Sequence, residues 1–82
     1  MWTVADDDKL KLLIACDRIK AAMLKKLWIK QNAGYSGWDK RSMRGIIGKK
    51  IQEHIKKGFN DQDNIVDTMN LLMMLWYQRE IE

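Results

Sequence analysis

The sequence contains no proline, one cysteine, one histidine and only five glycines among its 82 residues. Because proline and glycine are the residues that most often interrupt helices, their scarcity predicts long continuous helices. The lone Cys16 cannot form an internal disulfide, which fits a reducing cytoplasm. One histidine and one cysteine also argue against Ser-His-Asp or Cys-His catalytic groups, and no zinc-ligand spacing or glycine-rich phosphate loop is present.

The sequence also lacks a long apolar run. No segment approaches the roughly 20 apolar residues that a membrane-spanning helix needs, so we expect no membrane association. Residues 1–8 are acidic where a signal peptide is basic, so no leader is expected. With 46% hydrophobic residues and no low-complexity tract, residues 1–82 are interpreted as one folded cytoplasmic domain with a thin core.

The net charge of +4 hides an uneven distribution. Residues 1–17 carry −2, residues 18–57 carry +10, and residues 58–82 carry −4. A basic centre between acidic ends can attract phosphate groups, or it can neutralise an acidic helix of its own fold or of a partner chain. A solvated basic surface without a ligand is the simplest alternative.

Apolar residues recur at helical spacing in three segments, which predict an all-α protein with helices at about 6–33, 40–57 and 62–80. The three aspartates at positions 6–8 are typical of a helix start. Glycine-containing segments then separate the helices. Asp39 or Ser42 is expected to cap the second helix, and Asp61 or Asp63 the third.

The third segment is expected to be the central helix, with Ile65, Met69, Leu72 and Trp76 on its main stripe. The first helix is too long for a chain of this size to cover. We therefore expect this three-helix unit to assemble into a helical bundle, as a homodimer or homotetramer.

Asp67 is the strongest candidate for a functional residue, because its carboxylate lies on the most apolar of the expected helices. Asp63, Asp67 and Asn70 share one helical face, an arrangement that can hold a divalent metal inside a helical bundle. The alternative is that Asp67 is one half of a structural ion pair. His54 is likewise either a ligand or, more simply, a packing residue.

From Tyr35 to Tyr77, about half of the chain, the sequence resembles the MazG-like all-α nucleoside triphosphate pyrophosphohydrolases. The Ser-Gly-Trp segment ending at Trp38 is similar to a loop of that superfamily. Asp67, Asn70 and the following Met-Met pair are similar to one of its helices. The resemblance implies a dimeric helical protein whose acidic residues hold Mg²⁺, which binds a nucleoside triphosphate and helps water to release pyrophosphate.

The departures from the family pattern fall on the metal ligands. Aligned on Ile51, the family's paired glutamates become Lys49 and Lys50, and only the third survives, as Glu53. The acidic residue expected three positions before Asp67 is Asn64, with Asp63 one place away. The site implied by the resemblance comprises Glu53 and Asp67 as catalytic residues, Glu53, Asp67 and Asp63 as Mg²⁺ ligands, and Lys49, Lys50, Lys57, Asn70 and Trp38 as substrate contacts.

Two lysines at a cation site would repel the metal, whereas an ammonium there would pair directly with Asp67. We therefore expect an internal lysine–carboxylate cluster in place of the metal, on a family-like scaffold that lacks efficient hydrolysis. One alternative is a surviving Mg²⁺-dependent pyrophosphohydrolase. The other is a small basic protein that binds a nucleotide, a nucleic acid or a host protein, such as a virus-encoded accessory or anti-defence factor. Sequence-specific DNA reading is not expected, because the basic stretch lacks interleaved aromatic residues and a helix-turn-helix signature.

Overall fold

The computed structural model describes residues 6–81. Over these residues the chain forms three α-helices, α1 (Asp6–Asn32), α2 (Arg44–Lys57) and α3 (Gln62–Glu80), together with a short 3-10 helix, η1 (Arg41–Met43). The predicted all-α class is confirmed. None of these helices combines the length and the apolar character that crossing a membrane requires.

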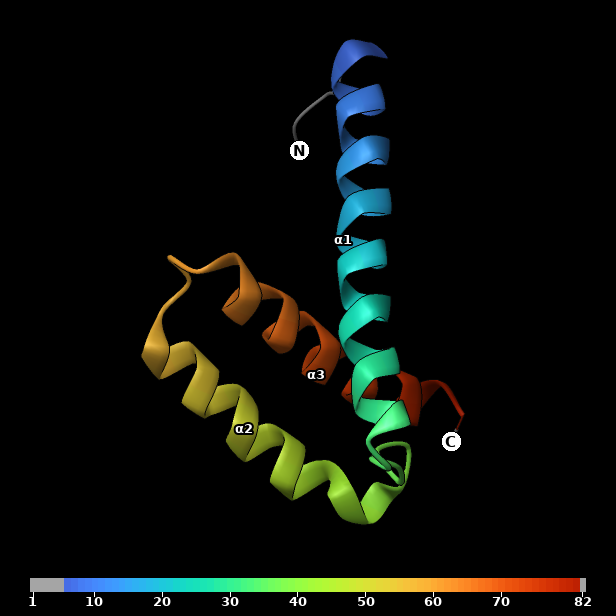
Figure 1. Cartoon of the computed structure of the whole chain (residues 1–82), viewed down its shortest axis with the longest axis vertical. Helices are drawn as coiled ribbons and strands as arrows, with labels where there is room; N and C mark the ends of the chain where they lie inside the picture. Colours follow the sequence, from blue (N-terminus) through green and yellow to red (C-terminus); the bar gives the residue numbers. More distant parts are fainter. Residues whose placement is uncertain (1–5, 82) are drawn as a thin grey trace.

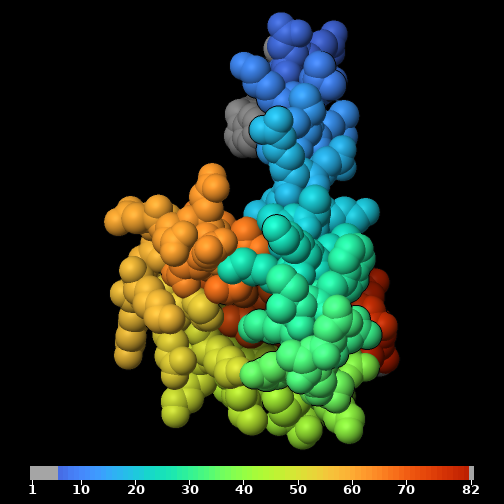
Figure 2. Space-filling view, viewed as in Figure 1, coloured from blue at the N-terminus to red at the C-terminus, as the bar shows by residue number. Residues whose placement is uncertain are grey.

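The helices are arranged as a hairpin crossed by a long helix (Figure 1). α2 and α3 run antiparallel and are joined by a short turn, and the C-terminal half of α1 packs across α3. The N-terminal half of α1 stands clear of the rest as a column (Figure 2). Every residue from 6 to 18 is exposed, so the packed part of the molecule begins near Ile19.

The second helix begins later than predicted, at Arg44. Residues 41–43 form the 3-10 turn instead, closed by a bond from Met43 N to Lys40 O of 2.9 Å. Ser42 therefore lies inside this turn, and Asp39 lies before it. The residue at the N-cap position is Met43, and among the described residues no side chain caps this helix, so the expected cap at Asp39 or Ser42 is wrong.

The third helix begins as its sequence predicts. Asp61 is the N-cap, and its carboxylate accepts a hydrogen bond of 3.0 Å from Asp63 N. The preceding turn needs Gly58, whose φ of +82° lies in the region that side chains disfavour.

The core is small and lies between α2 and α3. It consists of Ile47, Ile51 and Leu71, with Met74 and Leu75 packed against it. The predicted apolar face of the second helix is thus buried at Ile47 and Ile51, although Ile55 beyond them is exposed. A chain of this length buries only a limited apolar volume.

The register of α3 differs from the prediction. Met69, Leu72 and Trp76 of the expected core stripe are 40%, 48% and 62% exposed. Beside Val66 and Leu71, four buried residues of α3 are polar: Asn64, Thr68, Asn70 and Gln78. Three of them donate to backbone carbonyl groups on α1, α2 and the loops, and Thr68 donates to Asn64 O within α3. Since buried carbonyl groups need donors, this polar face suits the interior, and the apolar stripe is left on the surface.

Candidate functional site

The first candidate site is an ion-pair cluster between α1 and α3. Lys26 Nζ lies 2.9 Å from Asp67 Oδ1 and 3.5 Å from Asp63 Oδ1. It also donates to the backbone carbonyl of Asp63 at 3.2 Å. The Lys26 and Asp67 side chains are only 27% and 30% exposed, so this pair is shielded from solvent more than an ordinary surface pair.

This environment changes the acidity of Lys26. Partial burial lowers the pKa of Lys26, but the hydrogen bond and the attraction from Asp67, helped by Asp63, outweigh that effect and raise the pKa above its ordinary value. At neutral pH Lys26 is therefore positively charged, and its ammonium group pairs with the carboxylate of Asp67. The sequence had pointed to Lys49 and Lys50 as partners of this carboxylate, whereas the structure assigns that contact to a lysine of α1.

The residues around Asp67 do not fit the magnesium site that the family resemblance implies. Mg²⁺ requires several oxygen ligands in octahedral geometry. Within residues 6–81 no three acidic, histidine or cysteine side chains come together in a way that could hold a metal, and Glu53 is exposed on α2. The Lys26 ammonium already lies next to Asp67, where it would repel a metal cation. Two like unit charges 4 Å apart repel by about 4 kcal/mol at an effective dielectric of about 20.

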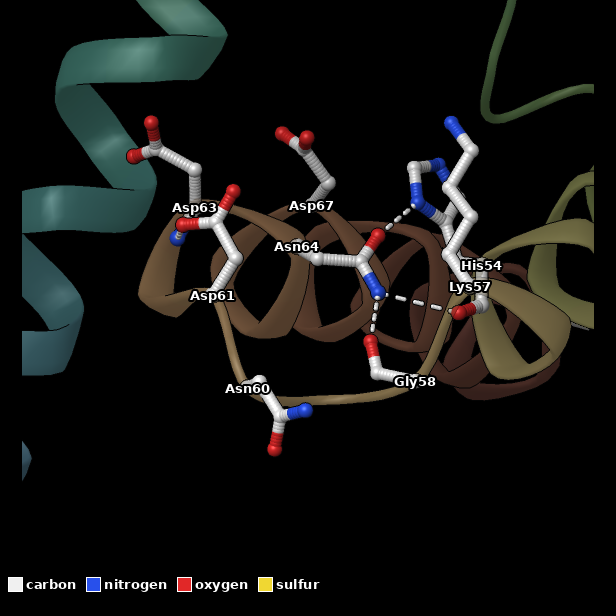
Figure 3. Close-up of a pocket in the computed structure, with 8 residues that line it drawn as sticks. All are labelled: His54, Lys57, Gly58, Asn60, Asp61, Asp63, Asn64 and Asp67. Atoms are coloured by element: carbon white, nitrogen blue, oxygen red, sulfur yellow. Dashed lines mark hydrogen bonds between the residues drawn. The ribbon is translucent and has the colours of Figure 1, made fainter.

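Asn64, at the position where the family resemblance implies a carboxylate, has a structural role (Figure 3). Its amide nitrogen donates to His54 O at 2.9 Å and to Gly58 O, and its amide oxygen accepts from His54 Nδ1. These bonds tie the end of α2 to α3. His54 is thus a packing residue whose ring bonds to Asn64, and no sequence pattern had indicated that Asn64 would be buried.

A cavity of about 320 Å³ lies beside this cluster. Figure 3 shows Asp61, Asp63 and Asp67 on one side and His54 and Lys57 on the other. Three carboxylates against Lys57 give the lining a negative charge, which Lys26, paired with Asp67 and Asp63, offsets only in part. This cavity therefore disfavours phosphate, even though Lys57 contributes to it.

The second candidate site is a larger pocket of about 520 Å³ lined by the C-terminal half of α1, the 33–40 loop, α2, and Met73 and Met74 of α3. Trp38 and Lys50, two of the substrate contacts predicted from the sequence, both line it. Trp28 and Tyr35 add aromatic surface, and Lys30 adds a second positive charge. The pocket thus combines flat apolar walls with two ammonium groups and one carboxylate, that of Asp39, so its charged groups are positive on balance.

The loop that carries Trp38 is held by a buried glutamine. Gln78 is 2% exposed; its amide nitrogen donates to Trp38 O at 2.6 Å, and its amide oxygen accepts from Arg44 Nε at 3.0 Å. The Trp38 ring also lies against Tyr77, with ring centroids 5.3 Å apart. α3 therefore positions the aromatic wall of the pocket.

The remaining predicted contacts lie apart from this pocket. Lys49 is exposed on α2, and Lys57 lines the smaller cavity. Glu53, predicted as a catalytic residue and Mg²⁺ ligand, is also exposed on α2. Asn70 is buried between α1 and α3, where its amide nitrogen donates to Met23 O at 3.3 Å. Its amide oxygen meets no partner within the described part of the chain. The structure therefore divides the predicted substrate contacts, and only Trp38 and Lys50 share a pocket.

Comparison with known proteins adds no relative: the chain matches no family model, no curated protein and no solved structure. The two sites themselves are the basis for a functional proposal.

Proposed function

We propose that this protein is a nucleotide-binding relative of the MazG-like pyrophosphohydrolases that does not hydrolyse its ligand. The observation that supports this most directly is the contact of 2.9 Å between Lys26 Nζ and Asp67 Oδ1. An internal ammonium replaces the metal charge, so Asp67 is neutralised without Mg²⁺. The scaffold keeps a ligand pocket but lacks the ligand set that activates water on a triphosphate.

The ligand is proposed to bind in the larger pocket. A nucleobase can stack on the indole of Trp38, an interaction typically worth about 1–3 kcal/mol per base. Lys50 and Lys30, at the same pocket, supply the positive charge for the phosphates. The smaller cavity, with its three carboxylates, offers no such attraction.

Calorimetric titration with a panel of nucleoside mono- and triphosphates tests this proposal. Binding should persist with EDTA present. Trp38→Leu and Lys50→Ala should each weaken binding by about tenfold, which corresponds to about 1.4 kcal/mol. Lys49→Ala is the matched control, because Lys49 is the exposed neighbour of Lys50 and does not line the pocket.

Two outcomes would contradict the proposal. The first is pyrophosphate release that depends on Mg²⁺ and disappears in Asp67→Asn, which would show a working hydrolase. The second is an absence of nucleotide binding together with binding of RNA or DNA that weakens steeply with salt, which would show a nucleic-acid-binding protein.

A further inference from the structure

The carboxylate of the larger pocket belongs to Asp39, which follows Trp38 directly in the 33–40 loop. Asp39 is exposed, and within residues 6–81 its side chain takes part in no ion pair or hydrogen bond. A carboxylate does not favour phosphate binding, because like charges repel. Its place beside the proposed stacking surface of Trp38 relates it to the base of the ligand instead.

The positive charges of this pocket come from other elements. Lys30 lies in the last turn of α1, and Lys50 lies in α2. Ammonium groups only donate hydrogen bonds, whereas an ionised carboxylate only accepts them. The two helices therefore supply donors to phosphate oxygens, and the loop supplies an acceptor to N–H groups of a base.

Two hydrogen bonds hold the segment that carries Trp38 and Asp39. Lys40 N donates to Gly37 O at 3.1 Å, which closes a turn with Trp38 and Asp39 at its two central positions. The buried Gln78 amide donates at 2.6 Å to Trp38 O, the carbonyl of the peptide bond that joins these two residues. The stacking ring and the carboxylate are thus held together before a ligand arrives, which lowers the entropy lost on binding.

The common nucleobases differ in the donors that they present to such an acceptor. Guanine alone has two adjacent donors on its Watson–Crick edge, N1–H and the N2 amino group, and these match the two oxygens of one carboxylate. Adenine and cytosine present one amino group next to an unprotonated ring nitrogen, and uracil presents one N–H between two carbonyl groups. A carboxylate that faces any of these three bases also meets an acceptor, which leaves it with an unfavourable contact.

We propose that Asp39 makes the larger pocket selective for guanine nucleotides. Its carboxylate accepts hydrogen bonds from N1–H and the N2 amino group of a base that lies against Trp38. Such bonds are charge-assisted and bidentate, so they are stronger than neutral hydrogen bonds and fix the orientation of the base. This inference rests on the proposed function, because it identifies the base of the same ligand.

Calorimetric titration of the intact chain with GTP, ATP, CTP and UTP in the presence of EDTA measures the preference for the base, because all of these ligands carry the same triphosphate. GTP should bind at least about tenfold more tightly than each of the others. In Asp39→Ala this preference should disappear. Asp17→Ala is the matched control and should keep the preference, since it removes the same charge from an exposed position of α1 that does not line the pocket.

Inosine triphosphate tests the contact with the amino group alone, because inosine lacks the N2 amino group of guanosine and keeps N1–H. It should bind the intact chain about tenfold more weakly than GTP, and the two should bind Asp39→Ala equally. A substitution that only disturbed the loop would weaken both ligands alike and keep their ratio, which would overturn the direct contact.

The remaining outcomes separate this inference from the proposed function. Equal binding of all the triphosphates would overturn the guanine preference and leave nucleotide binding in place. A preference for GTP that persists in Asp39→Ala would overturn the role of Asp39. If the intact chain bound none of the triphosphates, the proposed function itself would be overturned, and the inference with it.

Discussion

Lys26 Nζ lies 2.9 Å from Asp67 Oδ1, and this ion pair joins α1 to the N-terminal half of α3. The two residues are 41 positions apart in the chain, so their contact exists only in the folded protein. It holds the long first helix on the hairpin and gives Asp67 a permanent counter-ion.

The energy of this pair can be isolated with a double-mutant cycle of Lys26→Met and Asp67→Asn. Since both side chains are less than one third exposed, we expect a coupling energy of about 1 kcal/mol. Urea unfolding followed by circular dichroism measures it. Lys25→Met, at the exposed neighbouring position, should show no coupling to Asp67→Asn. A coupling energy of zero between Lys26 and Asp67 would show that this ion pair does not stabilise the fold.

The same pair should make stability depend on pH in the alkaline range. Folding raises the pKa of Lys26 above its ordinary value of 10.5, so the pair contributes fully below that pH and is lost as the pH rises through the folded-state pKa. The stability difference between the native chain and Lys26→Met should therefore be constant near neutral pH and narrow above about pH 10.5. Thermal unfolding across this range tests the prediction. A stability difference between the native chain and Lys26→Met that grows above about pH 10.5 would contradict the prediction.

Removing the ammonium should open the acidic cluster to a divalent cation. In Lys26→Ala, Asp63 and Asp67 lose their shared positive partner and the repulsion that it exerts on a metal. We expect Mn²⁺ to bind at least about tenfold more tightly than to the native chain, as measured by electron paramagnetic resonance. Lys25→Ala should keep the native affinity. Equal Mn²⁺ affinity in all three proteins would show that Lys26 does not control cation binding.

Asn64 should be among the least replaceable residues of the hairpin. Asn64→Ala removes its hydrogen bonds to His54 and Gly58, and we expect it to lower the free energy of unfolding by about 2 kcal/mol. Asn64→Asp, which introduces a carboxylate, should be worse, because it directs an anionic oxygen at two carbonyl groups. Urea unfolding measures both. Asn60→Ala, in the exposed part of the same turn, should have little effect; a similar loss there would contradict the role of the Asn64 bonds.

Gln78 should control the shape of the aromatic pocket. Gln78→Ala leaves the carbonyl of Trp38 without this donor, and we expect a stability loss of about 1–3 kcal/mol. The near-ultraviolet circular dichroism of the Trp38–Tyr77 contact should weaken, and nucleotide affinity should fall with it. Gln52→Ala, an exposed glutamine on α2, is the control. An unchanged aromatic signal in Gln78→Ala would mean that other contacts fix the loop.

The candidate site was only partly predictable from the sequence. Asp67 stood out because a carboxylate on an apolar helix needs a partner, and the expectation of an internal lysine–carboxylate cluster has its counterpart in the structure. Which lysine pairs with Asp67 could not be predicted, because Lys26 is one of several cationic residues near the end of the first helix. Trp38 and Lys50 share a pocket only because the 33–40 loop folds back onto α2 and α3.

The sequence by itself determined the all-α class and the approximate limits of the helices, and it narrowed the cap of α3 to Asp61 or Asp63, because helix periodicity, caps and glycine turns are local properties. Only the tertiary structure decided which side of α3 is buried. That helix is apolar nearly all round, so periodicity could not choose between its faces. The choice was made by the carbonyl groups at His54, Gly58 and Trp38, which need donors that Asn64 and Gln78 supply. With those polar side chains facing the interior, the stripe of Met69, Leu72 and Trp76 on α3 lies on the surface.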